Sequence, residues 1–562
     1  AGADIVEGAD FTYMPVYSIG IYNRPEGITT ENSDKQINWV TDAYLTYDKQ
    51  IDDHSLNVVG GVSLQQFYSK SNSVTGRGTI DNALNQLSNQ TSFVGSGSTI
   101  VPGLASVFLR ANYGFKGKYL VTATVRRDGS SRFGPENRFG TFPSASVAWR
   151  LSEEEFMKSS LLFNDVKLRA SYGLTGNQNI GNFAFITRAA AASYVSGNTV
   201  TIGNAPQNIG NPNLKWETAK QFDIGLDFSL FRGRINSTID FYDKRSQDLL
   251  VSTPIALTSG VNVNPILNIG SLKNTGVEFA ITSRNIRKKQ FSWDTDFNIT
   301  YNVNKVLDIG TNSIGNPLAI PGELIPLSNQ PTNLTRSGRP VGAFYMYEFA
   351  GIWQLGEEEA AKKWANAVPG DPKYTDTNGN GVFDEADKIY VGNPHPKIFG
   401  GIDNTVTYGD FSLSVFLNFS AGNKLYNTAR NLFSRSVPFV QNFAEVSDFW
   451  TTDNPSNAVP RPSQGGNTTT LATLVSTRFL ENADFLRVKN VSVSYKLPSR
   501  LLTNVALEGA QLTLSGTNLL TFTKYTGLDP EASSRSSLLS AGIDYTPYPL
   551  TRLFSLSIKA NF

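Results

Sequence analysis

Hydrophobic and polar residues alternate one by one over many short stretches of this chain. In the segment 554–562, apolar side chains occupy every second position, and mostly polar ones fill the positions between them. The same alternation recurs over 119–125, 222–230, 293–301 and 411–419. Successive side chains of a β-strand point to opposite faces, so the pattern predicts strands with one apolar face each. The core of a soluble sandwich or the lipid around a wet-centred barrel would cover such faces.

The connections between the predicted strands are either short turns or long loops. Tight turns are expected at Asp52–His54, Lys116–Lys118, Arg232–Arg234 and Tyr408–Asp410. Long polar stretches rich in Gly, Ser and Asn are expected as loops near 69–104, 176–214, 246–268, 304–396, 422–482 and 521–549. Short turns at one end and long loops at the other are typical of outer-membrane barrels, whose long loops are extracellular.

Counting strand directions back from the carboxyl end places every tight turn at the same end. The predicted fold is therefore an all-β, transmembrane antiparallel β-barrel with about 16 strands in this chain. The expected strands are 11–23, 36–50, 54–68, 105–116, 118–128, 140–151, 166–175, 216–230, 232–245, 269–283, 289–303, 397–408, 410–421, 484–496, 508–519 and 550–562. Parity excludes Phe344–Phe349 as a lone spanning strand, which assigns it to an outer excursion over 304–396.

Composition agrees with this fold without requiring it. The chain is 40% hydrophobic, and its net charge of +1 argues against nucleic acid as a partner. Its mean hydropathy of −0.23 is ordinary, because lumen-facing polar residues balance lipid-facing apolar ones. No apolar run approaches the roughly 18 residues of a membrane-spanning helix. The absence of cysteine fits an exported protein. The first residues lack the basic and apolar regions of a signal peptide, so we expect a mature or partial chain.

Seven motifs spread over the chain resemble one family. They are Val125–Gly134, Phe142–Arg150, Leu168–Gln178, Asn211–Thr218, Val391–Lys397, Phe485–Asn490 and Asn518–Glu531. The residues of these motifs and their order along the chain are similar to those in the barrel of SusC-like (SusC/RagA) TonB-dependent outer-membrane transporters.

This resemblance implies an amino-terminal plug inside a 22-stranded barrel and a segment on which TonB pulls. The expectation is that 1–562 is the barrel portion, with the plug and about six early strands absent from it. The family resemblance also implies a SusD-like surface lipoprotein as partner and an oligosaccharide or peptide as substrate. Alternatively, the chain closes alone as a 16-stranded pore with an aqueous channel.

The segment Asp376–Asp387 has the spacing of a calcium-binding loop. Oxygen-bearing side chains fall at positions 1, 3, 5, 9 and 12, a glycine stands at 6, and position 7 offers a backbone carbonyl. The candidate ligands are Asp376, Asn378, Asn380, Val382, Asp384 and Asp387. A structural Ca²⁺, or Mg²⁺, would brace the outer excursion. An Asx-rich surface turn without metal is the alternative.

Other residues offer little chemistry. His54 and His395 are too far apart in sequence to indicate a metal site, and His54 falls at a tight turn. The acidic segments 153–158 and 357–364 indicate short solvated helices. Aromatic residues in the predicted loops could stack on sugars, but packing is the favoured interpretation; they include Tyr194, Trp353, Tyr374 and Phe439. We therefore predict no catalytic residues and no enzyme.

Three function classes remain open from the sequence. The favoured one is TonB-dependent import of a large nutrient across the outer membrane of a Gram-negative bacterium. The alternatives are a passive porin and a soluble or surface-attached glycan-binding β-protein.

Overall fold

The computed structural model describes residues 1–562 except 20–21, 254, 256–257, 259, 262, 312–314, 326–327, 435–440, 463–470, 499, 501, 503–506, 536 and 562. By its contacts the chain divides into two compact units. The first comprises 1–148, 171–221 and 246–269, and the second 149–170, 222–245 and 270–562. Among the described helices, none combines the length and the apolar character needed to cross a membrane.

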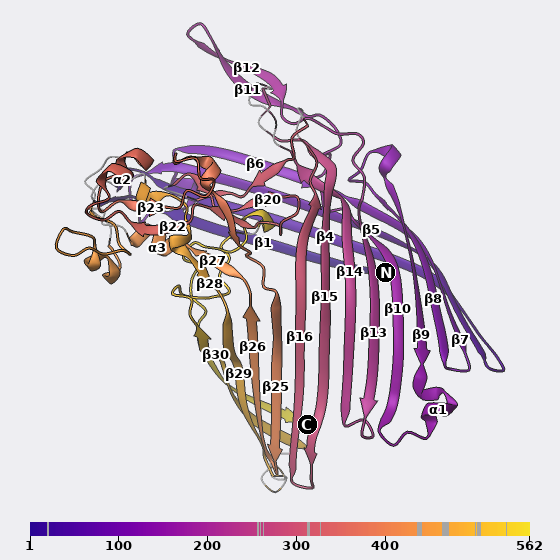
Figure 1. The fold of residues 1–562 in the computed structure, drawn as a ribbon. Coiled ribbons are helices and arrows are strands. Elements are labelled where there is room, and N and C mark those ends of the chain that lie inside the picture. Colours follow the sequence, from indigo (N-terminus) through magenta and orange to yellow (C-terminus); the bar gives the residue numbers. More distant parts are fainter. Residues whose placement is uncertain are drawn as a thin grey trace. The chain divides into compact units, whose positions relative to one another are not determined.

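Seventeen strands belong to one sheet (Figure 1). They are β1 (Gly2–Met14), β4 (Gly27–Ile51), β5 (His54–Thr79), β6 (Ser92–Ile100), β7 (Gly103–Phe115), β8 (Tyr119–Ser130), β9 (Phe139–Arg150), β10 (Phe163–Asn177), β13 (Glu217–Leu230), β14 (Ile235–Ser252), β15 (Ile266–Arg287), β16 (Phe291–Asp308), β25 (Ile398–Tyr408), β26 (Phe411–Ala421), β29 (Phe485–Lys496), β30 (Gly509–Thr523) and β32 (Leu553–Asn561). In the first unit β1 pairs with β4, β4 with β5, β5 with β6 and β7, and β7 with β8, all antiparallel. In the second unit antiparallel registers join β15, β16, β25, β26, β29, β30 and β32 in that order.

Shorter elements lie in the connections. The strands are β2 (Tyr17–Ile19), β3 (Tyr22–Arg24), β11 (Ala189–Ser196), β12 (Thr199–Pro206), β17 (Ala319–Pro321), β18 (Leu324–Ile325), β19 (Gln330–Pro331), β20 (Leu334–Arg336), β21 (Phe344–Met346), β22 (Phe349–Ile352), β23 (Pro372–Tyr374), β24 (Ile389–Gly392), β27 (Lys424–Asn427), β28 (Leu480–Asn482) and β31 (Ile543–Asp544). The α-helices are α1 (Glu155–Lys158), α2 (Glu358–Ala365) and α3 (Thr428–Phe433). Both short acidic helices expected from the sequence are therefore present, as α1 and α2.

Sixteen of the seventeen sheet strands, all but β6, correspond to the predicted ones. Several predicted boundaries are wrong, and the largest errors fall in the first three of these strands, where β4 for example begins at Gly27 rather than at 36. The first strand was expected at 11–23 but is Gly2–Met14, and it ends there because Pro15 has no N–H to continue the ladder. The predicted loop 69–104 contains the end of β5 and the whole of β6, which pair over 69–77 and 92–100. These Ser-, Gly- and Asn-rich residues lack an apolar face, so alternation could not reveal them.

All four predicted tight turns are confirmed. They connect β4 to β5, β7 to β8, β13 to β14 and β25 to β26. Each contains left-handed backbone, as at Asp52 (φ 49°), Gly117 (φ 63°), Gly233 (φ 78°) and Gly409 (φ 56°). In the second unit the long connections after β16, β26 and β30 emerge from the opposite end of the strands (Figure 1).

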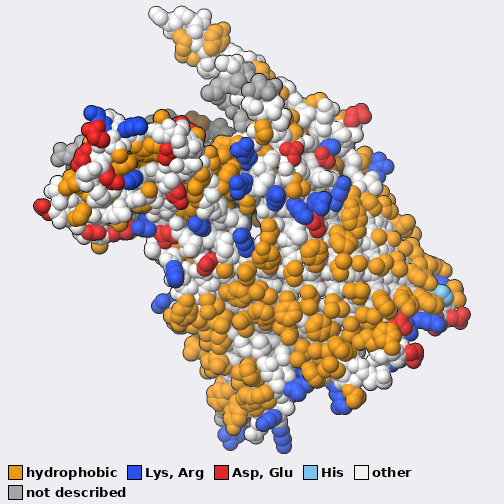
Figure 2. Space-filling model, in the orientation of Figure 1, with side chains coloured by type: hydrophobic (Ala, Val, Ile, Leu, Met, Phe, Trp, Pro, Cys, Tyr) orange, Lys and Arg blue, Asp and Glu red, His pale blue; other side chains and the backbone are white. Residues whose placement is uncertain are grey.

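The apolar face of the strands is on the outside. Leu514 is 56% exposed, Phe554 69% and Ile558 72%. Hydrophobic side chains cover the strand surface in Figure 2, whereas charged side chains gather at the strand ends. Two apolar faces meeting in a dry centre would have left these side chains buried, so the alternation reflects a lipid-facing surface rather than a sandwich core.

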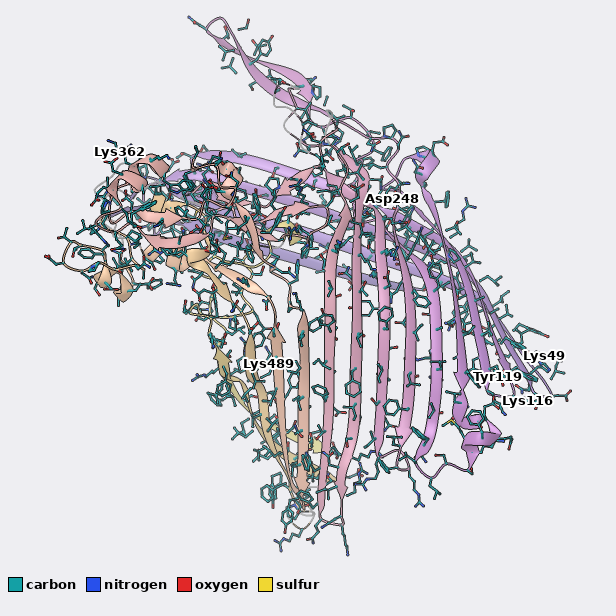
Figure 3. All side chains as sticks on the ribbon, viewed as in Figure 1. Lys49, Lys116, Tyr119, Asp248, Lys362 and Lys489 are labelled. Carbon is teal, nitrogen blue, oxygen red and sulfur yellow. The ribbon has the colours of Figure 1, made fainter. Side chains whose placement is uncertain are left out.

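Aromatic side chains gather at the tight-turn end of the first unit. The His54 ring lies 4.9 Å from that of Phe115, and Phe115 stacks on Tyr119 at 6.3 Å, measured between ring centroids. His54 Nδ1 and the Tyr113 hydroxyl are 2.7 Å apart. Figure 3 shows Tyr119 at this end beside Lys49 and Lys116. The arrangement is that of an interfacial aromatic girdle, and the exposed turn position expected for His54 is confirmed.

Arginine substitutions on the two faces of β30 should differ in cost. Leu514→Arg places a charge in lipid and should lower the free energy of unfolding in lipid vesicles by about 2–4 kcal/mol. Thr513→Arg, one residue earlier on the polar face, should cost much less. Urea titration of both variants measures the difference, and equal costs would contradict the assignment of the two faces.

Candidate functional site

Ion pairs connect three strands on the polar face of the second unit. The Arg169 guanidinium of β10 lies 2.8 Å from Asp227 of β13 and 2.8 Å from Asp240 of β14. Lys167 adds a second contact to Asp227, also at 2.8 Å. Gly225 makes the crossing possible, because a Cβ there would lie 2.2 Å from Asp240 Oδ1 and 2.5 Å from Arg169 Nη2. The lumen-facing side of the wall is therefore polar and internally paired.

A glycine of β15, two strands further along the sheet than β13, is crossed in the same way. The Tyr242 hydroxyl of β14 donates to Asn302 Oδ1 of β16 at 2.9 Å, passing over Gly276 of β15. A Cβ at Gly276 would lie 2.5 Å from that hydroxyl oxygen. A glycine in the middle strand thus allows its two neighbours to bond directly.

Three outer connections fold together into a body with its own core. The connection between β16 and β25 contributes Ile325, Phe344 and Met346, and that between β26 and β29 contributes Tyr426, Val475 and Phe479. Ile543 comes from the connection between β30 and β32, where β31 pairs in parallel with β27. The stretches expected as polar loops therefore contain buried apolar residues that fix their shape.

Of the loop aromatics expected to pack rather than to bind sugar, Trp353 and Tyr374 do so. Trp353 and Tyr374 are each 5% exposed and share a cluster with Tyr347. Burial raises the pKa of Tyr347 to about 12. Tyr194, on the β11–β12 hairpin, remains 57% exposed, and Phe439 lies outside the described residues.

The candidate cation loop is closed by its own backbone hydrogen bonds. Asp376 accepts the N–H groups of Gly379 and Gly381 at 2.7 and 2.8 Å, and both glycines have positive φ. Asp387, which is 0% exposed, accepts the N–H groups of Thr377 and Asp384 at 3.1 and 3.0 Å.

Three further candidate ligand side chains also accept hydrogen bonds from backbone N–H groups of the loop. Asn378 and Asn380 accept the N–H groups of Asn380 and Val382 at 2.9 and 2.8 Å. Asp384 accepts that of Ala386 at 2.7 Å. In the part of the chain that the structure describes, no three or more His, Cys, Asp or Glu side chains gather closely enough to hold a metal. A metal here would rely on amide and carbonyl oxygens as well as carboxylates.

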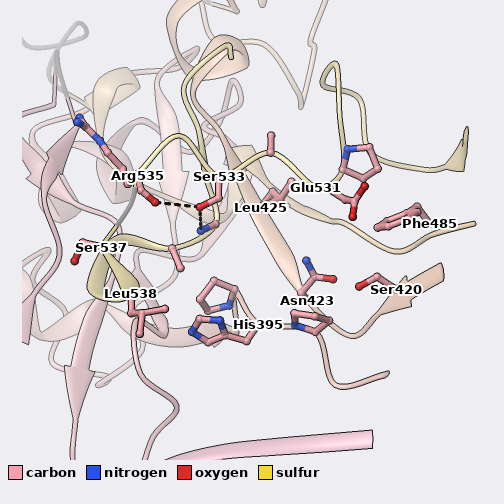
Figure 4. A pocket seen from close by; sticks show the side chains of 16 residues that line it. His395, Ser420, Asn423, Leu425, Phe485, Glu531, Ser533, Arg535, Ser537 and Leu538 are labelled. Carbon is pink, nitrogen blue, oxygen red and sulfur yellow. Dashed lines mark hydrogen bonds between the residues drawn. The ribbon is translucent and has the colours of Figure 1, made fainter. Parts of the chain in front are cut away.

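A pocket of about 310 Å³ opens in the outer body (Figure 4). Residues 394–396 form one side, the start of β29 another, and residues from 530–535 and 537–542 a third. Asn423 and His395 line it, and neither Asn423 Oδ1 nor His395 Nε2 has a hydrogen-bond partner.

Arg487 connects the third side of the pocket, through Glu531, to the wall. Its side chain is 3% exposed and lies 2.6 Å from Asp529, with Glu531 as a second carboxylate partner. Its Nε donates to Thr521 Oγ1 at 2.9 Å. Because the guanidinium is satisfied on three sides, it orders the loop that closes the pocket.

The sequence did not lead us to predict this pocket, although the motifs that form it had been noticed. Three of the family-like motifs meet here: Val391–Lys397 supplies His395, Phe485–Asn490 supplies Arg487, and Asn518–Glu531 supplies Asp529. His395, for which the sequence indicated no metal site, belongs to no group of three or more His, Cys, Asp or Glu side chains among the described residues. The separation of the motifs along the chain concealed their proximity in space.

Comparison with known proteins identifies the family. The model described as "TonB dependent receptor-like, beta-barrel" matches residues 7–519. TonB-dependent receptor P3 of Formosa agariphila is 34% identical over 545 residues, covering 93% of this chain and 52% of that protein. TonB-dependent receptor SusC of Bacteroides thetaiotaomicron is 31% identical over 575 residues, covering 100% of this chain and 53% of that protein. A solved structure of the RagAB peptide transporter matches with a TM-score of 0.83 at 25% identity, covering 100% of this chain and 59% of that one.

The chain belongs to the TonB-dependent receptor β-barrel family. The predicted SusC/RagA resemblance, membrane-barrel fold and outer-membrane location are thereby confirmed, as is the prediction that the family is one of receptors rather than enzymes. The chain spans about half the length of the curated relatives it matches.

Removing the Arg487 side chain should loosen the pocket loop without unfolding the wall. Arg487→Met leaves two carboxylates without their cation, so local opening of 524–552 should become easier by about 2–5 kcal/mol. Amide hydrogen exchange measures this opening. Lys489→Met, on the same strand, is the matched control and should leave exchange unchanged (Figure 3). Unaltered exchange in Arg487→Met would rule out the proposed role of this residue.

Proposed function

We propose that this chain forms the wall and outer loops of an energised importer of a large nutrient, an oligosaccharide or a peptide. Family membership carries this proposal. The two-faced wall supports it, because apolar residues such as Ile558 face outward while the polar network around Arg169 lies on the other side. Membrane barrels that transport solutes have this distribution.

The leakage that a wide open barrel would cause favours energised import over an open pore. A barrel wide enough for an oligomer would leave an aqueous channel unless something filled it. The outer membrane has no ATP, so opening has to be driven mechanically from the inner membrane. We therefore include a plug and a TonB-contacting segment in the proposed whole protein, with the complete barrel at the 22 strands that the resemblance implies.

A SusD-like surface lipoprotein is the proposed partner. The similarity to SusC supports this choice, as does the folded outer body, which offers a shaped surface rather than loose loops. The proposed division of labour gives capture to the lipoprotein and the outer body, and passage to the barrel. The alternative of a soluble glycan-binding protein is disfavoured by the exposed apolar strand faces.

Uptake and conductance together test the proposal. Cells with the complete receptor should accumulate a fluorescent oligosaccharide or peptide only while TonB and the proton-motive force are intact. The purified receptor should not give a steady open current in planar bilayers. TonB-independent uptake with a steady current would replace the importer by a passive porin.

We also propose that the Asp376–Asp387 loop binds Ca²⁺, or Mg²⁺, as a structural brace. Its oxygen-bearing side chains all lie within this one short segment. Each carboxylate keeps lone pairs beyond those that accept hydrogen bonds from backbone N–H groups. Asn at two ligand positions lowers the ligand charge, so we expect weaker binding than in an acidic EF-hand loop.

The double variant Asp376→Asn, Asp384→Asn tests this brace. At a hundredfold excess of Ca²⁺ over Kd, the unaltered loop should gain about 2.7 kcal/mol, seen as a rise in the melting temperature of the outer body. The double variant keeps its acceptors for backbone N–H and should lose the rise. Glu359→Gln on α2 is the control and should retain it. If calcium gives no rise in the unaltered protein, the loop is an Asx-rich turn.

A further inference from the structure

We propose that a second pocket, where the outer body meets the ends of β25 and β26, binds an acidic group of the nutrient, a carboxylate or a similar oxyanion. This inference rests on the proposed function and deepens it, because it selects acidic oligomers whichever backbone carries the charge. The pocket has a volume of about 450 Å³, and Arg339, Lys397 and Lys424 supply three cations to its lining.

Strand β24 positions two of these cations. The Arg339 guanidinium lies over the ring of Tyr390, 4.8 Å from the ring centroid. Two residues further along the strand, Gly392 leaves room for the stem of Lys424, because a Cβ there would lie 2.7 Å from Lys424 Cδ. The Lys424 N–H donates to the carbonyl of Asn393 at 2.8 Å. Both cations are therefore anchored to one short segment of the outer body.

The third cation comes from the wall. Lys397 directly precedes β25, and Gly422 directly follows β26. A Cβ at Gly422 would lie 3.2 Å from Lys397 Cβ, so the glycine allows the lysine to lie against this turn. Lys424 is only two residues further along the chain. The lining thus combines a cation of the wall with two of the outer body.

The charge of this pocket is not compensated. Asp484 is the one carboxylate among the described residues that line it, and its Oδ1 accepts the Gly422 N–H at 2.7 Å. Among the described residues, none of the three cations forms an ion pair with a carboxylate, whereas Arg487 nearby is paired with two. The whole chain carries a net charge of only +1, so the excess is local. A concave surface with an excess of one sign concentrates ligands of the opposite sign.

The three cations are accessible to a ligand. Arg339 and Lys397 are exposed, and Lys424 is half-buried. The planar guanidinium can donate two N–H groups to one oxyanion, and each lysine adds a compact positive charge. A basic oligomer would be repelled here, and a neutral one would gain no charge-assisted hydrogen bond. The geometry therefore favours an acidic ligand over both.

Fluorescence anisotropy on the complete receptor tests this inference with matched labelled probes. The peptide pair is tetraglutamate and tetraglutamine, and the saccharide pair is tetragalacturonate and its neutral methyl ester. In at least one pair the acidic probe should bind about tenfold more tightly than its neutral counterpart. The advantage should shrink as the salt concentration rises, because salt screens exposed charges.

Variants assign the preference to this pocket. Arg339→Gln combined with Lys397→Gln removes two exposed cations, so the protein should fold and lose most of the acidic advantage. Lys362→Gln combined with Lys363→Gln removes the same charge from α2 and should keep the advantage (Figure 3). If the pocket variant fails to fold, Lys424→Gln alone should still reduce the advantage severalfold.

Equal binding of acidic and neutral probes in both pairs would overturn the acidic site. An acidic advantage that the pocket variant retains in full would overturn it as well. TonB-dependent uptake that does not distinguish acidic from neutral oligomers would overturn only the acidic site. An acidic preference lost in the pocket variant, but without energised uptake, would overturn only the importer.

Discussion

The structure depends on one constraint: in lipid, every backbone N–H and C=O of a spanning segment must be bonded within the protein. A sheet whose strands are joined edge to edge meets this requirement, as the successive antiparallel pairings of β25, β26, β29 and β30 illustrate, with a register shift at Lys489 of β29. In strands that span the membrane, the alternation of side chains decides which residues face lipid and which face the interior. Each strand presents one row to lipid and one to the interior, so average hydropathy stays ordinary although half of the wall is apolar.

The polar row must also be satisfied, and here glycine has a specific use. At Gly225 and Gly276 the missing Cβ leaves room for side chains of the two neighbouring strands to bond across the middle strand. Ion pairs spread over three strands add stiffness to the wall that ladder hydrogen bonds between adjacent strands do not provide. The lumen face is therefore both wet and internally braced.

Much of this fold could be predicted because membrane strands obey a simple period. Alternation located sixteen sheet strands, and turn chemistry located the tight turns at Asp52 and Gly409. The errors arose where the period was absent, as in the polar outer half of β5, or where a single residue such as Pro15 overrode it. The outer body was expected only as loops, because its core is assembled from residues far apart in sequence, such as Phe344 and Ile543. The candidate cation loop was the one local motif visible from spacing, and its ligand role stays a prediction.

The family-like motifs mark packing sites rather than isolated functional residues. In the first unit, Phe133, Phe142 and Trp216 from three such motifs share one buried cluster, and the Phe142 ring packs so closely on Gly176 of a fourth that a Cβ there would lie 2.1 Å away. In the second unit, three other motifs meet at Arg487 and the adjoining pocket.

The two meeting points are held together by different interactions. The cluster around Trp216 is closed, since its indole N–H donates to the Arg138 carbonyl at 3.0 Å. The segments around Arg487 are held by charge, since its guanidinium pairs with Asp529 and Glu531. Apolar packing in the first case and ion pairs in the second thus join motifs that are far apart along the chain.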